Sequence, residues 1–65
     1  MAKIDITQEI HNLVISLYSK GKDFDEISNE IEILIRDKYN IKLYVQQADE
    51  ITKNAFNNLG LKLDI

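Results

Sequence analysis

The chain has 65 residues, no cysteine, one histidine and a formal net charge of -3 at pH 7. This length corresponds to one domain near the lower limit for independent folding, and the absence of cysteine excludes disulfides and thiolate metal sites. A hydrophobic fraction of 45% is sufficient for a core, while the negative charge disfavours a strong, sequence-independent grip on nucleic acid.

The sequence has no proline and only two glycines, so almost nothing interrupts helices. The first predicted helix covers about residues 7–20. Asp5 and Gln8 form a capping-box pair at its start, and Gly21 supplies the left-handed conformation that ends a helix. Its apolar residues have the spacing of one helical face: Ile6, Ile10, Leu13, Val14 and Leu17.

The second predicted helix covers about residues 24–39. Asp23 and Glu26 form another capping-box pair at its start, and Asn40 can adopt the left-handed conformation after its end. Its apolar residues also share a face: Phe24, Ile27, Ile31, Leu34 and Ile35.

The third predicted helix covers about residues 44–59 and ends at Gly60. We expect its inner face to consist of Val45, Ala48, Thr52, Ala55, Phe56 and Leu59. The tail Leu61–Ile65 alternates apolar and polar residues, which predicts either a short strand, pairing with Ile41–Leu43, or an arm that docks on a partner.

Three helices with short connections predict a single all-α domain over residues 1–65, a compact three-helix bundle with a short extended tail. Ile15 and Ile33 point away from the core faces of their own helices. Isolated exposed apolar residues are normal on a protein surface. The alternative is that both contribute to a homodimer interface, which a core as thin as this one favours.

Catalysis and metal binding lack support in the sequence. The serines have no base at a recognisable spacing, and His11 is expected on the outer side of the first helix. The segment from Gly21 to Glu26 does not follow the spacing of a calcium loop. We therefore expect no catalytic residue, metal, cofactor or small-molecule substrate.

No signal peptide and no apolar run of membrane-spanning length occur in the sequence. We therefore expect a cytoplasmic protein with no membrane partner.

Two segments carry a resemblance to a known family. The first is Leu17-Tyr18-Ser19-Lys20-Gly21-Lys22-Asp23-Phe24-Asp25-Glu26-Ile27, in which a helix ends at a glycine and the next opens with Glu-Ile. The second is Tyr39-Asn40-Ile41-Lys42-Leu43-Tyr44-Val45-Gln46-Gln47-Ala48. Together they resemble the helix-turn-helix domains of transposases, resolvases and phage regulators.

The resemblance implies that the third helix lies in the major groove of DNA as a recognition helix. The DNA contacts would then come from Arg36, Lys38, Lys42, Tyr44, Gln46, Gln47, Lys53 and Asn54. Residues 1–32 hold seven acidic and three basic residues, and residues 33–65 hold four and five, so the acidic excess lies away from this surface. The alternative interpretation of the amide-rich third helix is a solvated polar face.

The chain departs from the family pattern in its second predicted helix, which is longer than usual. The run Glu30–Ile33 stands where the family has the glycine of its turn. A plain antiparallel bundle accommodates the same apolar positions, so the direction of the third helix stays open.

Two functions follow as hypotheses. The first is a small DNA-binding regulator of a phage or other mobile element that acts as a dimer. The second is a protein-interaction module, an adaptor or an inhibitor of a host protein, which would combine exposed Ile15 and Ile33 with an acidic helical surface. That surface comprises Asp23, Asp25, Glu26, Glu30 and Glu32.

Overall fold

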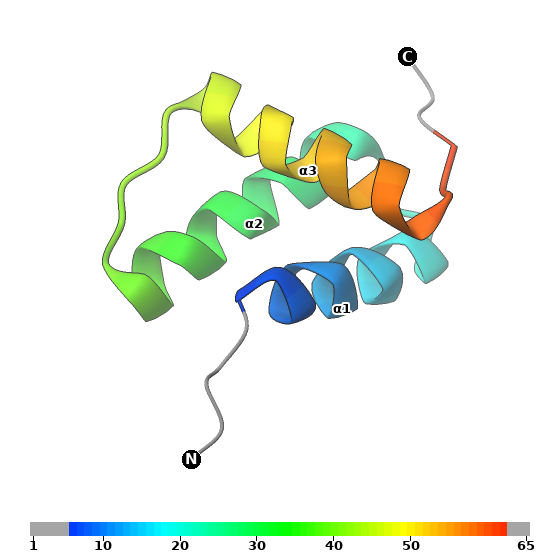
Figure 1. Cartoon of the computed structure of the whole chain (residues 1–65), viewed down its shortest axis with the longest axis horizontal. Coiled ribbons are helices and arrows are strands. Elements are labelled where there is room, and N and C mark those ends of the chain that lie inside the picture. Colours follow the sequence, from blue (N-terminus) through cyan, green and yellow to red (C-terminus); the bar gives the residue numbers. More distant parts are fainter. Residues whose placement is uncertain (1–5, 63–65) are drawn as a thin grey trace.

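The structure, a computed structural model, describes residues 6–62 and contains three helices (Figure 1). They are α1 (Ile6–Ser19), α2 (Phe24–Tyr39) and α3 (Val45–Leu59), with bounds within one residue of the predicted ones. No strand occurs in this range, and the predicted compact all-α bundle is confirmed. Asp5, the predicted first cap, and Leu63–Ile65, most of the predicted tail, lie outside the described residues.

The turn between α1 and α2 follows local side-chain chemistry. Gly21 has φ +85°, the left-handed conformation expected after the first helix. Asp23 caps α2, with its Oδ1 accepting from the backbone N–H of Glu26 at 2.9 Å. The Glu26 carboxylate lies 3.5 Å from Lys22 Nζ instead of returning to Asp23, so half of the predicted capping box forms.

The connector from α2 to α3 begins at Asn40, which has φ 57° and ψ 37°. Its N–H donates to the Arg36 carbonyl at 3.0 Å, which ends the helix as predicted. Tyr44 precedes the first turn of α3, and its N–H donates to the side-chain oxygen of Gln47 at 3.0 Å.

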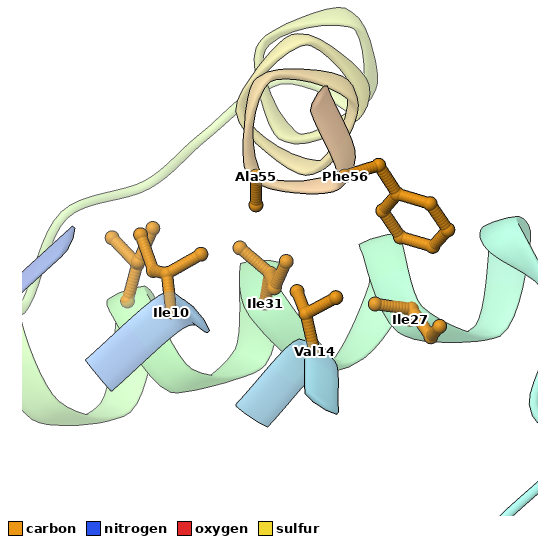
Figure 2. Close-up of a cluster of buried hydrophobic side chains, with 7 residues drawn as sticks. Ile10, Val14, Ile27, Ile31, Ala55 and Phe56 are labelled. Carbon is orange, nitrogen blue, oxygen red and sulfur yellow. The ribbon is translucent and has the colours of Figure 1, made fainter. Parts of the chain in front are cut away.

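The helices form two layers. α1 and α2 run antiparallel in one layer, and α3 lies across both of them (Figure 1). The view in Figure 2 is along α3, while α2 runs across the picture, so α3 crosses this layer steeply. The core between the layers consists of Ile10, Val14, Ile27, Ile31, Ile35, Ala55 and Phe56.

Aromatic rings close one end of this core. The Phe56 ring, which is buried, lies edge-on to Tyr18 with ring centroids 5.9 Å apart and to Phe24 with centroids 5.6 Å apart. Phe56 therefore joins α3 to both helices of the other layer.

Two predictions for the inner face of α3 need correction. Val45 was expected on the inner face, but its side chain is 70% exposed. The first turn of α3 lies at the edge of α2, where Val45 is beside Asn29 and Glu32 and not over the core. Ile51 was not assigned to the inner face, yet it packs against the core from the side of α3 that meets Ile35. Because α3 crosses the other two helices, the residues that it buries differ from those that the apolar periodicity of its sequence predicts.

Leu34 also differs from the prediction, since it is half-buried and lies outside the core cluster. Of the predicted tail, Leu61 packs against the core. Its N–H donates to the Phe56 carbonyl at 2.9 Å, a bond that closes the C-terminal end of α3.

Candidate nucleic-acid interface

The outward face of α3 is polar along its whole length. Gln46, Glu50, Lys53 and Asn57 are all exposed and follow one another at intervals of four, three and four residues. This spacing aligns them in a single stripe on a helix. The opposite side of α3 is buried at Ala48, Thr52, Ala55 and Phe56. The third helix therefore presents one straight row of side chains to the surroundings.

Gln47 and Asn54 flank this stripe and have other contacts. The side-chain oxygen of Gln47 accepts the N–H of Tyr44, so this acceptor is engaged in holding the start of α3. Asn54 is exposed, but it also lines a hollow of about 330 Å³ between α1 and α3, together with Ile10 and His11. Of the three predicted amide contacts on α3, Gln46 is the one centred on the stripe.

His11 was expected on the outer side of α1, and this expectation is wrong. The residue is half-buried and lines the same hollow as Asn58 of α3. α3 lies over this flank of α1, which the pattern of α1 alone does not reveal.

Asp49 of α3 is half-buried although its side chain is a carboxylate. Its Oδ1 accepts from the hydroxyl of Ser28, which is 4% exposed, at 2.7 Å. Turning Asp49 toward α2 leaves Glu50 as the acidic residue of the outward stripe. The charge that a phosphate backbone would meet there is lower than the sequence suggests.

The predicted cations lie mainly near the connector. Arg36 and Lys42 are exposed there, with Arg36 Nε 3.6 Å from Oδ1 of Asp37, while Lys53 is exposed on the stripe itself. Lys38 is engaged elsewhere, since its Nζ lies 2.5 Å from Oε2 of Glu9 on α1. The structure therefore brings fewer unneutralised cations to this side than the sequence indicated.

Glu9, in the first turn of α1, forms this ion pair with Lys38 and a hydrogen bond with Tyr39. The Tyr39 hydroxyl donates to its other carboxylate oxygen. Hydrogen bonding from Lys38, followed by that from Tyr39, lowers the pKa of Glu9 below its ordinary value of 4.5. This network ties α1 to the C-terminal end of α2 and is structural in character.

Apolar side chains are exposed where the connector enters α3. Tyr44 is 75% exposed, Val45 70% and Ile41 49%. Tyr44 was predicted as a contact residue, whereas Val45 was assigned to the core. An apolar residue in the first turn of a helix can lie beyond the end of the helix–helix contact. The position of Val45 in the first turn was therefore the one sequence feature that could have predicted its exposure.

One margin of this surface is acidic. A small hollow of about 220 Å³ next to Val45 is lined by Asp25, Glu32 and Asp49, among other residues. These carboxylates lie on the α2 side of Val45 and would repel a polyanion that approached from there. The more favourable approach is over the side that carries Lys53.

The predicted dimer residues lie on different faces. Ile15 is 50% exposed on α1, near His11 and Tyr18, which face α3. Ile33 is half-buried, outside the core cluster, and half a helical turn away from the inward-facing Ile31 and Ile35. The structure does not bring Ile15 and Ile33 together into one patch.

Comparison with protein-family models, with curated proteins and with solved structures finds no match for this chain. Within residues 6–62, no cluster of histidine and acidic residues is arranged to hold a metal ion. None of the three helices in that range has the length and apolarity required to cross a membrane.

Proposed function

We propose that this chain is a small helix-turn-helix-like DNA-binding regulator of a phage or other mobile element, with α3 as its recognition helix, acting as a dimer. The observation that carries the proposal is the steep crossing of α3 over the antiparallel α1–α2 pair (Figures 1 and 2). The exposed stripe of α3 is polar. In helix-turn-helix domains, a recognition helix set across its neighbours enters the major groove.

The connector gives further support. Helix-turn-helix turns often contain glycine, because the chain must change direction within a few residues. Here Asn40 provides the left-handed conformation, with φ 57°. The long second helix is compatible with this arrangement, since the change of direction follows Tyr39 instead of the middle of the helix.

The chemistry of the surface predicts modest affinity. Lys42 and Lys53 are exposed cations available to phosphates, whereas Arg36 is paired with Asp37 and Lys38 with Glu9. Two phosphate contacts per copy predict a logarithmic salt dependence with a slope of about -1.8. A dimer would double these contacts and compensate for the weak binding of one copy.

Fluorescence anisotropy with a labelled random-sequence duplex at low salt tests this function. We expect saturable binding that weakens as salt rises, and that weakens further in the variant Lys53→Ala. Lys20→Ala is the matched control, because Lys20 is exposed in the turn between α1 and α2, away from the start of α3. Absence of binding at micromolar protein, or equal losses for both variants, would argue against α3 as the DNA-contacting helix.

The outer side of α2 favours a second candidate, a protein-interaction module. Asp25, Glu26 and Glu30 are all exposed there, and Glu32 is half-buried. Such a surface complements a basic site on a partner protein. This function predicts no duplex binding, together with salt-sensitive capture of a basic partner that Glu26→Gln combined with Glu30→Gln abolishes and Lys53→Ala does not.

A further inference from the structure

The first turn of α3 places two different chemistries next to each other in an exposed position. Val45 is 70% exposed, and Gln46 follows it on the outward stripe. Resting on the proposed function, we infer that this turn reads A·T base pairs in the major groove, with Gln46 directed at adenine and Val45 at the thymine methyl group.

Gln46 has the donor and acceptor that adenine requires. The major-groove edge of adenine presents the N6 amino group as donor and N7 as acceptor, and a primary amide pairs with both at once. Within residues 6–62, no side-chain hydrogen bond engages Gln46, whereas the oxygen of Gln47 is held by the Tyr44 N–H. Gln46 can therefore make the bidentate contact that Gln47 cannot.

Val45 would recognise the second base of the pair, thymine. Thymine alone carries a methyl group in the major groove, and small apolar side chains contact it. Burial of one methyl-sized group contributes enough to change affinity about fourfold. The N-terminal residues of a recognition helix are those that reach base edges, and Val45 and Gln46 are the first two residues of α3.

The experiment begins by selecting bound duplexes from a random library with the wild-type chain. Affinity is then measured by anisotropy for the selected duplex and for two modified forms. One form replaces thymine by uracil, which removes the methyl group. The other replaces adenine by 7-deazaadenine, which removes the N7 acceptor. The variants are Val45→Ala and Gln46→Met, with Asn12→Ala as the control for an exposed amide on α1.

We expect uracil to weaken wild-type binding about fourfold. The same replacement should leave Val45→Ala nearly unaffected. We expect 7-deazaadenine to weaken wild-type binding about tenfold, since one of the two hydrogen bonds of the bidentate contact is lost, and to change the affinity of Gln46→Met little. Asn12→Ala should respond to both modified duplexes as the wild type does.

Two different failures can be distinguished. If the wild type binds duplexes with equal affinity before and after both modifications, the A·T reading is overturned while DNA binding stands. If a modification weakens the variants as much as the wild type, the assignment to Val45 or Gln46 is wrong. If no duplex is bound at all, the proposed function fails, and this inference fails with it.

Discussion

Glu9 shows how one side chain can connect elements that the sequence keeps apart. It lies in the first helix, yet its carboxylate accepts from Lys38 and Tyr39 at the far end of the second. The same contact removes Lys38 from the set of cations that could bind phosphate. A residue with a structural role in α1 thereby alters the surface expected of α2.

The lowered pKa of Glu9 predicts an acid-dependent loss of stability. A carboxyl group whose pKa is lower in the folded state than in the unfolded state stabilises the fold above its unfolded value. For Glu9 this stabilisation should disappear as pH falls from about 4.5 through the lower pKa of the folded state. Thermal unfolding followed by circular dichroism should show that Glu9→Gln is less stable at neutral pH and loses less stability in acid.

Glu30→Gln is the matched control, because Glu30 is an exposed carboxylate on α2. Its unfolding should retain the wild-type acid dependence. An unchanged acid dependence in Glu9→Gln would show that the bonds from Lys38 and Tyr39 do not lower the pKa of Glu9 in solution.

A polar contact joins α2 and α3. Ser28 and Asp49 join the two helices through a hydroxyl–carboxylate hydrogen bond of 2.7 Å, at a place where Ser28 is nearly inaccessible. A hydrogen bond to a charged group stabilises a fold by roughly 1.5–3 kcal/mol, and partial exposure of Asp49 reduces this value. The contact fixes where α3 crosses α2.

We expect Ser28→Ala to lower the free energy of unfolding by about 1 kcal/mol, since the half-buried Asp49 can recover water as a partner. A double-mutant cycle with Asp49→Ala, measured by urea denaturation, should show that the two changes are not additive. Ser19→Ala provides the control, because the Ser19 hydroxyl donates to the carbonyl of Ser16 in the same helix. Additive losses would mean that the two helices are not coupled through this bond.

Helix ends were predictable from the sequence because they depend on neighbouring residues. Asp23 and Asn40 act locally, through a carboxylate beside unpaired N–H groups and a backbone that tolerates positive φ. The direction of α3 was not predictable, since an apolar periodicity defines which face is buried and not how helices cross. The errors at Val45 and Ile51 share this cause.

For the whole molecule, the proposed function includes association of two copies of the chain. The proposed dimer has two candidate contact residues, and the structure places them on different faces, so we expect a two-fold interface to be centred on one of them. We expect Ile15→Glu and Ile33→Glu to remain folded, because neither residue belongs to the core. Val14→Glu should unfold the chain, since Val14 is fully buried.

Light scattering on these variants separates the possibilities. If the chain dimerises through one of these faces, one of the two substitutions should yield a folded monomer and the other should leave the dimer intact. A wild-type chain that remains monomeric over a wide concentration range would remove dimerisation from the proposed function. Salt-dependent binding of a single copy would then be the form of DNA binding to test.

The position of Tyr44 has a spectroscopic consequence. The chain contains three tyrosines and no tryptophan, so its intrinsic fluorescence comes from rings in three different surroundings. Tyr18 lies against Phe56 and the Tyr39 hydroxyl is bound to Glu9, whereas Tyr44 is 75% exposed at the entrance to α3. A partner that covers the first turn of α3 would shield Tyr44 from a soluble quencher. The unlabelled chain therefore carries its own reporter at the surface where we propose that DNA binds.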